Sequence, residues 1–206
     1  MSKATQTDAM GSIQRGIKRT LDFVMSALGL ILLSPIFIII SVLMKFQGNG
    51  PIFFRQIRIG YKGKPFVILK FRTISKKTEK NTPQLIAKTS SKSSTPFEKF
   101  LREHHLDELP QLWNVLVGDM SLVGPRPERK YFIDKIMEHT DLYTVIYNMR
   151  PGLTSEATLY NGYTDTMEKM LKRLQMDISY FERRSLWLDF KIIIKTFVNI
   201  ISGNKF

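Results

Sequence analysis

The chain has 206 residues, of which 43% are hydrophobic, enough for one compact domain with a sizeable core and a short appendage but not for two ordinary domains. It has no cysteine, which excludes disulfides, thiolate nucleophiles and cysteine zinc sites, and the spacing of His104, His105 and His139 excludes an HExxH-type zinc hydrolase. The excess of 31 Lys and Arg over 18 Asp and Glu gives a formal charge of +13, which suits nucleic acid, an anionic membrane surface or a phosphorylated substrate.

The N-terminal part of the chain predicts a membrane anchor. Residues 1–14 are polar, and we expect them to be disordered. The run FVMSALGLILLSPIFIIISVLM, residues 23–44, contains no charged residue, and about 20 such residues suffice for a helix to span a bilayer. The run is too long for a cleaved signal peptide, and no small-x-small cleavage site precedes Lys45. A plain spanning helix and a re-entrant segment both remain open at this point.

Two features favour the re-entrant form, a monotopic anchor over residues 15–45. Ser34 and Pro35 lie in the middle of the run, where the proline breaks or bends a helix and the serine can satisfy a freed carbonyl. Positive flanks prefer the cytoplasm, so a helix-break-helix that enters one leaflet and returns satisfies two basic flanks better than a straight helix does. The flanking cations are Arg15, Lys18 and Arg19 before the run and Lys45, Arg55, Arg58, Lys62 and Lys64 after it.

Residues 46–206 are expected to form a compact α+β domain, predominantly helical, that rests on the membrane. Runs of β-branched and aromatic residues on both sides of the turn 60–63 predict a hairpin of strands 52–59 and 65–73. Residues 75–95 show no sustained period and are expected to form a mobile loop. Helical patterns follow over 96–102, 108–117, 128–138, 143–149, 166–181 and 186–201.

The last of these segments is broadly apolar, with a narrow polar stripe that includes Asp189 and Lys191. It is suited either to the core or to the membrane interface with Trp187 at headgroup level, and the sequence leaves both placements open. Its charges disfavour a deep membrane span.

The stretch LDELPQLWNVLVGDMSLVGPRP, Leu106–Pro127, carries the clearest chemistry. Adjacent acids at the start of a helical pattern are often explained by the helix dipole alone. Here Arg102 precedes the acids Asp107 and Glu108, and two prolines hold Arg126 on a stiff extended element. A carboxylate that can bind Mg²⁺ or attack phosphorus, together with guanidinium groups that pair with phosphate oxygens, is the composition of a phosphate site.

Several segments, in order and spacing, resemble the bacterial sugar transferase family, the small monotopic phosphoglycosyl transferases that begin polysaccharide and glycoprotein glycan assembly. They are the anchor with its Ser-Pro break, KFRT (Lys70–Thr73), LDELPQLWNVLVGDMSLVGPRPE (Leu106–Glu128), RPGLT (Arg150–Thr154) and DISYFERRSLWLDFKII (Asp177–Ile193). The likeness covers nearly the whole chain from about residue 15 to residue 200, and its central motif is highly specific.

The resemblance implies transfer of a phosphosugar from a UDP-sugar to a polyprenyl phosphate, expected to be undecaprenyl phosphate, with release of UMP at the cytoplasmic face of the bacterial inner membrane. Family enzymes pass through a covalent phosphosugar on the aspartate of the dyad. Asp107 is therefore the expected nucleophile, and Glu108 is its partner, for metal binding or for activating the acceptor phosphate. Both carboxylates are expected to bind Mg²⁺. A homodimer is compatible with the resemblance. Nucleic acid is not an expected partner.

The resemblance also indicates which cations should contact phosphate, and it includes one departure. The expected contacts are Lys70, Arg72, Arg102, Arg126 and Arg150. After RPGLT the family usually has a GxAQVxGR-like run, whose arginine looks like a phosphate or nucleotide contact, whereas this chain reads SEATLYNGYTD and has Tyr163 at that place. Either another cation (Arg150, Lys169 or Arg173) takes over the phosphate, or the nucleotide-sugar is held differently.

Two other classes of function compete with this one. A membrane-tethered nucleic-acid-binding protein would explain the charge, but the sequence has no RNP-like or helix-turn-helix signal. An inactive scaffold that recruits later glycosyltransferases is compatible with the departure at Tyr163, although the intact dyad Asp107-Glu108 argues against it. The sequence does not distinguish one UDP-sugar from another.

Overall fold

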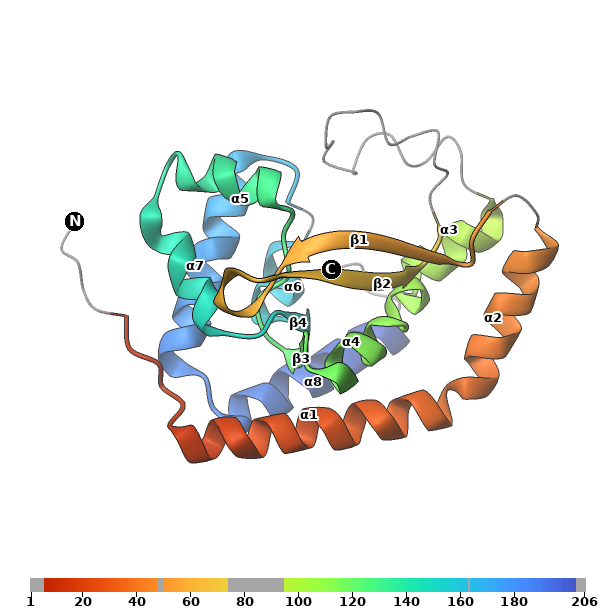
Figure 1. Ribbon diagram of the computed structural model, residues 1–206, viewed down its shortest axis with the longest axis horizontal. Coiled ribbons are helices and arrows are strands. Elements are labelled where there is room, and N and C mark those ends of the chain that lie inside the picture. Colours follow the sequence, from red (N-terminus) through yellow and green to blue (C-terminus); the bar gives the residue numbers. More distant parts are fainter. Residues whose placement is uncertain (1–5, 48–49, 74–94, 163, 203–206) are drawn as a thin grey trace.

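The computed structural model describes residues 6–47, 50–73, 95–162 and 164–202, and it is predominantly helical with two small two-stranded sheets (Figure 1). The expected α+β class is confirmed. The elements are α1 (Ser12–Leu32), α2 (Ser34–Phe46), β1 (Phe53–Ile59), η1 (Tyr61–Gly63), β2 (Pro65–Phe71), α3 (Pro96–Glu103), η5 (Leu106–Glu108), α4 (Gln111–Val117), β3 (Ser121–Val123), α5 (Lys130–Met137), η6 (Asp141–Asn148), β4 (Gly152–Thr154), α6 (Glu156–Asn161), α7 (Met167–Arg183) and α8 (Leu186–Ile201).

The uncharged run is divided into two helices at the Ser-Pro break. Helix α1 ends at Leu32, α2 begins at Ser34, and the two are bent by 58°, which makes an open V rather than a closed hairpin. The Ser34 hydroxyl donates to the carbonyl of Ile31 at 2.8 Å, the carbonyl that Pro35 leaves without a helical donor. In the described part of the chain, no helix taken singly has the length and apolar character to cross a bilayer, whereas this bent pair has them together.

Helix α1 buries its polar face and exposes its apolar one, the reverse of a surface helix in water. Lys18 donates to the Asp189 carboxylate at 2.6 Å, and the Asp22 carboxylate accepts from the Ser121 hydroxyl at 2.7 Å. Large exposed side chains cover the rest of the helix: Ile13, Ile17, Leu21, Phe23, Val24, Met25, Leu28, Ile31 and Leu32. Polar bonds thus fasten α1 to the body of the protein, and its apolar surface faces outward.

Helix α2, the second arm of the V, also packs against the body of the protein. Ile40 and Met44 of α2 are buried in one hydrophobic cluster with Phe71 of β2 and Leu101 of α3. Both helices of the V therefore contact the same folded unit: α1 packs against α4 and β3, and α2 packs against the cluster of β2 and α3 (Figure 1).

The predicted hairpin is confirmed, with strands slightly shorter than expected. Strands β1 and β2 pair antiparallel, with Phe53 opposite Phe71 and Ile59 opposite Pro65. The turn between them is a single 3-10 turn in which Lys62 has a left-handed backbone, φ 57°.

A second, parallel pair joins β3 to β4, with Ser121 opposite Gly152 and Val123 opposite Thr154. The two backbones approach so closely that a Cβ atom on Gly152 would lie 2.1 Å from the backbone nitrogen of Gly124. Only glycine fits there. The sequence did not predict these strands, because three residues are too few to show a period.

The main hydrophobic core lies among α5, η6, α7 and the end of β3, where Ile133, Tyr143, Leu174 and Phe181 are buried. The helix expected over 143–149 is instead the 3-10 segment η6, which begins at Asp141. Helix α6 was not predicted either. The expected mobile loop over 75–95 falls almost wholly outside the described residues.

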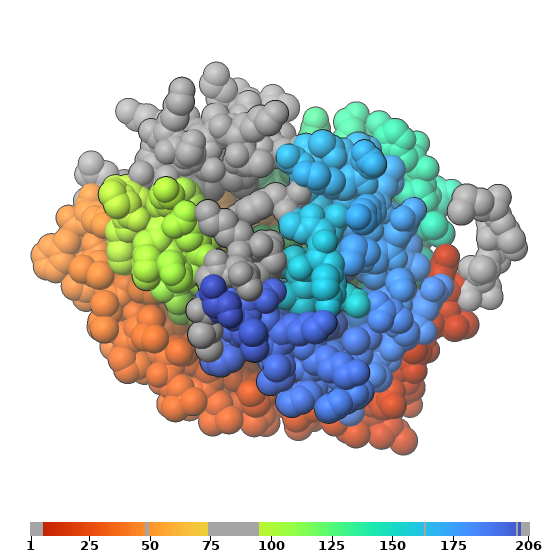
Figure 2. Space-filling model, turned by 180° about the vertical axis from the view of Figure 1, so that it is seen from behind, coloured from red at the N-terminus to blue at the C-terminus, as the bar shows by residue number. Residues whose placement is uncertain are grey.

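One further segment differs from expectation, and α8 is a segment whose placement the sequence left open. Residues 6–14, part of the segment expected to be disordered, lie against the C-terminal helices: the Asp8 carboxylate accepts from Arg184 at 2.5 and 2.7 Å, and Met10 is 1% exposed. Helix α8 packs one face on the core, where Ile192 is buried, and exposes the other, where Trp187 and Phe197 are 63% and 62% exposed. It lies along the same edge of the molecule as α1 (Figure 1 and Figure 2).

Candidate active site

The acidic dyad lies in its own turn between two helices. Helix α3 ends at Glu103, His105 adopts a left-handed backbone with φ 54°, and Asp107 and Glu108 follow in the 3-10 turn η5. Helix α4 begins only at Gln111, so the expected helix start at residue 108 is wrong. The dyad precedes this seven-residue helix instead of opening it, and the charges that act on it come mainly from side chains.

The turn that carries the dyad packs near α2. Leu106 and Leu109, which flank the two acids, pack against the cluster that contains Ile40 and Met44 of α2. The turn that carries the nucleophile expected from the resemblance is therefore held against the same hydrophobic cluster as α2.

Two cations from distant parts of the chain converge on Glu108. Its Oε1 atom accepts from Lys70 Nζ of β2 at 2.5 Å and from an Arg126 guanidinium nitrogen at 2.9 Å. Burial alone would raise the pKa of Glu108, but Arg126 and Lys70 outweigh it and hold this pKa well below its usual range. Glu108 in turn raises the pKa of Arg126. Glu108 is thus ionised at neutral pH.

Asp107 has the opposite environment. It is 8% exposed, and it forms no ion pair with any residue in the described ranges. Burial, followed by the charge of Glu108, raises the pKa of Asp107 to about 6. A buried carboxylate of raised basicity that no cation occupies suits a nucleophile, whereas its neighbour is already engaged.

Arg126 lies on an extended segment that is held on both sides. The Gly152 N–H donates to the carbonyl of Pro125 at 2.9 Å, and the Arg58 guanidinium donates to the carbonyl of Pro127 at 3.0 Å. The two prolines restrict the backbone between these bonds. The direction in which Arg126 points is therefore set by the fold before any substrate binds.

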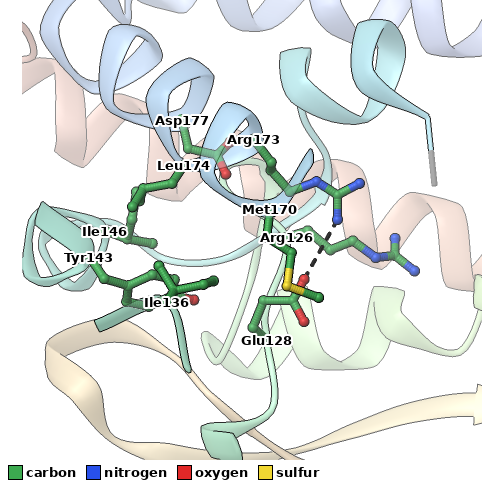
Figure 3. A pocket seen from close by; sticks show the side chains of 9 residues that line it. All are labelled: Arg126, Glu128, Ile136, Tyr143, Ile146, Met170, Arg173, Leu174 and Asp177. Carbon is green, nitrogen blue, oxygen red and sulfur yellow. Dashed lines mark ion pairs between the residues drawn. The ribbon is translucent and has the colours of Figure 1, made fainter. Parts of the chain in front are cut away.

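A cavity of about 20 Å³ lies beside Arg126 (Figure 3). Four charged side chains from α7 and the segment before α5 line it together with apolar and aromatic side chains from α5, η6 and α7. Arg173 and Arg58 each approach the Glu128 carboxylate at 3.6 Å. Burial raises the pKa of Asp177 to about 7 and lowers that of Arg58 to about 10. The cavity has room for little more than one water molecule.

The remaining predicted cations are held by other groups. Arg102 donates to the carbonyl of Thr73 at 2.6 Å, and the guanidinium of Arg72 lies against Gly50. Arg150 donates to the carbonyl of Gly118 at 2.9 Å, and its guanidinium lies 5.2 Å from the ring centre of Tyr61. Tyr163, where the sequence departs from the family pattern, lies outside the described residues.

The donor set of the dyad fits a magnesium ion that is shared with substrate. Mg²⁺ is usually held by one or two carboxylates together with substrate phosphates and water. Asp107 and Glu108 supply two adjacent carboxylates, and the described residues contain no cluster of three or more acidic, histidine or cysteine side chains that would form an all-protein site.

Comparison with known proteins shows the family to which the chain belongs. Residues 13–203 match the bacterial sugar transferase family. The chain is 40% identical over 190 residues to the UDP-glucose:undecaprenyl-phosphate glucose-1-phosphate transferase of Klebsiella pneumoniae, covering 91% of this chain and 40% of that protein. It is 40% identical over 188 residues to a protein of the same name from Caulobacter vibrioides, covering 90% of this chain and 70% of that protein.

A third relative has a different sugar in its name. The chain is 35% identical over 187 residues to the UDP-N-acetylgalactosamine-undecaprenyl-phosphate N-acetylgalactosaminephosphotransferase of Aeromonas hydrophila, covering 91% of this chain and 44% of that protein. The chain thus spans less than half the length of the Klebsiella and Aeromonas relatives. The protein belongs to the bacterial sugar transferase family.

Sequence reasoning did not assign Arg58, Glu128 or Asp177 to the site. Glu128 directly follows the Pro-Arg-Pro segment, and Asp177 is the first residue of the last matching motif. Their positions in these motifs could have indicated that both belong to the site. In the sequence, Arg58 is recognisable only as one of the basic residues that follow the apolar run. Its contact with Pro127 depends on how the hairpin packs, which no local pattern reports.

Proposed function

We propose that the protein transfers the phosphosugar of a UDP-sugar to undecaprenyl phosphate and releases UMP, as the first membrane step of glycan assembly. The observation that carries the proposal is the contrast within the dyad: Asp107 is buried and outside every ion pair of the described residues, while two cations hold Glu108 ionised. The substrates are taken from the names of the relatives, which include both glucose and N-acetylgalactosamine transferases.

In the first step, a carboxylate oxygen of Asp107 attacks the sugar-bearing phosphorus of the UDP-sugar. The bond from that phosphorus to the bridging oxygen breaks, UMP leaves with the bridging oxygen, and the sugar phosphate is held on Asp107 as an acyl phosphate. Arg126, whose side chain is 35% exposed, is placed to offset the charge that gathers on the phosphate oxygens.

In the second step, a phosphate oxygen of the polyprenyl acceptor attacks the same phosphorus. The bond between phosphorus and Asp107 breaks, which regenerates the carboxylate and yields the polyprenyl diphosphate sugar. Glu108 keeps Lys70 and Arg126 in place through both steps because it accepts a hydrogen bond from each of them. Bound at Asp107 and Glu108, Mg²⁺ would offset the negative charge of the diphosphate.

The proposal includes a membrane position at the cytoplasmic face of the bacterial inner membrane, with α1 and α2 as a re-entrant anchor. Three observations support it. The apolar face of α1 is exposed, both arms of the V contact the same domain, and exposed aromatic side chains line α8 beside α1. Trp187 and Phe190 of α8 suit the interface, where aromatic side chains are enriched.

The experiment is an assay of the purified protein in lipid nanodiscs with undecaprenyl phosphate and a panel of UDP-sugars that includes UDP-glucose and UDP-N-acetylgalactosamine. Release of UMP that requires the acceptor for more than one turnover is the expected result. A single turnover without acceptor should leave a phosphosugar on the peptide that contains Asp107, detectable by mass spectrometry. No release of UMP with any sugar of the panel would favour the alternative, an inactive scaffold.

A further inference from the structure

The cavity beside Arg126 contains a second guanidinium group whose hydrogen bonds are incomplete. Arg173 of α7 is 8% exposed and lines this cavity together with Arg126 (Figure 3). One of its terminal nitrogens donates to the carbonyl of Gly162 at 2.8 Å, and the other lies 3.6 Å from Glu128. Its Nε atom is buried and has no hydrogen-bond partner among the described residues.

A buried guanidinium group with unused hydrogen-bond donors lowers the stability of the fold. The nearby carboxylates do not take up these donors. Glu128 is shared between Arg173 and Arg58, and Glu108 is shared between Arg126 and Lys70. The two pairs therefore place four cations around two carboxylates. The other two acids nearby, Asp107 of the dyad and Asp177 of the cavity, form no ion pair with these cations in the described part of the chain, and the Nε atoms of Arg58 and Arg173 have no hydrogen-bond partner there. The guanidinium groups beside the dyad therefore keep donors that an anionic ligand could use.

The geometry also selects among the three cations that could stand in for the family arginine that this chain lacks after RPGLT. Arg150 is held by Gly118 and lies against Tyr61, and Lys169 pairs with Asp165 at 2.6 Å on the surface. Arg173 alone of these three shares a cavity with Arg126.

We propose that Arg173 binds a phosphate oxygen of the nucleoside diphosphate donor and acts with Arg126 as the second guanidinium of the donor site. The proposal rests on the proposed function, because it assigns a residue to that same site. The cavity is too small to enclose a phosphate, so the ligand binds at its mouth, where Arg126 reaches solvent.

The placement of the site indicates the donor, not the lipid acceptor, as the source of this phosphate. The dyad segment packs on α2 through Leu106 and Leu109, whereas α7 packs on α5, α6 and η6. Arg173 therefore lies on the side of the dyad that is turned away from α2. The acceptor phosphate, which arrives from the membrane, approaches from the α2 side.

The test is the affinity for UDP, measured by calorimetry on the full chain in nanodiscs with Mg²⁺, for the wild type, Arg173→Met, Arg173→Lys and the control Lys172→Met. Lys172 is exposed on the same helix, so its loss removes one charge without touching the cavity. We expect Arg173→Met to weaken UDP binding on the order of tenfold or more, the loss typical of a hydrogen bond to a charged group. Lysine keeps the charge but not the planar fork, so Arg173→Lys should stay clearly weaker than wild type. The control should remain within about twofold of wild type, as is usual for a surface substitution.

The outcomes separate this inference from the proposed function. UDP affinities of Arg173→Lys and Arg173→Met within twofold of wild type would overturn it and leave Arg173 a structural partner of Glu128. A rise in the KM for undecaprenyl phosphate with unchanged UDP affinity would assign the arginine to the acceptor instead. If Arg173→Met does not fold, Arg173→Lys decides. If the wild type binds UDP but turns over no UDP-sugar, the proposed function fails while the affinity comparison still decides the role of Arg173.

Discussion

Replacing Asp107 with asparagine should make the protein more stable and inactive at the same time. The amide is close in size to the carboxylate but cannot act as the nucleophile. It also carries no charge, so it removes the cost of placing an ionised group in a buried position beside Glu108. Activity and stability should therefore change in opposite directions.

The magnitude follows from the pKa. One pH unit corresponds to about 1.4 kcal/mol, so raising the pKa of Asp107 from its ordinary value of 3.8 to about 6 costs about 3 kcal/mol at neutral pH. The folded protein binds this proton more tightly than the unfolded chain does. The wild type should therefore gain stability as the pH falls from 7 towards 4, and the advantage of the Asn variant should disappear over the same range.

The measurement is the unfolding temperature in nanodiscs at pH 7 and at pH 4.5, together with release of UMP. For a chain of this length about 3 kcal/mol corresponds to roughly 6 °C or more. A variant that keeps more than about a tenth of wild-type activity would remove Asp107 from the role of nucleophile, given the losses typical of such substitutions. An Asn variant that is less stable at pH 7, or equally favoured at both pH values, would refute the account of burial.

The adjacent carboxylate supplies the matched control. Glu108→Gln also removes one charge, but it leaves Lys70 and Arg126 without their shared partner. Because the pKa of Glu108 is lowered, its ionised form stabilises the fold. The substitution should lower the free energy of unfolding by about 3 kcal/mol, the usual result of breaking a buried pair. Equal effects of the two substitutions would contradict the contrast within the dyad.

Three other predictions test the cation, the guanidinium and the anchor. Activity should vanish in EDTA and return with Mg²⁺ or Mn²⁺, since hard cations prefer oxygen ligands. Arg126→Lys should lose at least about tenfold in specific activity, because lysine cannot reproduce the planar fork that pairs with phosphate. Ser2→Cys and Ser202→Cys should both resist a membrane-impermeant thiol reagent in intact cells, and adding Pro35→Leu should expose the first of them by restoring a continuous helix.

Each of these has a clear contrary result. Full turnover in chelator would exclude a required metal. Near wild-type specific activity of Arg126→Lys and Arg126→Ala, accompanied by lower unfolding temperatures, would make Arg126 a structural partner of Glu108. Labelling of Ser2→Cys in intact cells in the otherwise wild-type chain would indicate a spanning helix.

Local signals predicted the elements whose causes are local. Pro35 divides the apolar run at the expected place, and the turn around Lys62 closes the expected hairpin. The β3–β4 pair was not predictable, because its stability depends on Gly124 and Gly152, which approach each other from segments about 28 residues apart and carry no periodic pattern.

In the site too, residues of one motif were predictable, and pairings between distant segments were not. The sequence indicated Asp107, Glu108 and Arg126 as one cluster because they lie in one motif. It indicated Lys70 as a phosphate contact, whereas the structure places this lysine on Glu108, 38 residues further along the chain. Which cation meets which carboxylate depends on the packing of β2 against η5, and residue types alone do not fix that pairing.

The bonds of Lys18 and Asp22 fasten α1 directly to the domain that carries Asp107. When α1 and α2 lie in one leaflet, as proposed, the distance of Asp107 from the plane of the lipid phosphates is then set by the fold. Adjusting a rigid segment to a thinner or thicker bilayer costs fractions of a kcal/mol per ångström of mismatch. With α1 and α2 in the re-entrant position proposed above, we expect a change in bilayer thickness to tilt the whole domain, and turnover of the proposed reaction to depend on the acyl chain length of the host lipids.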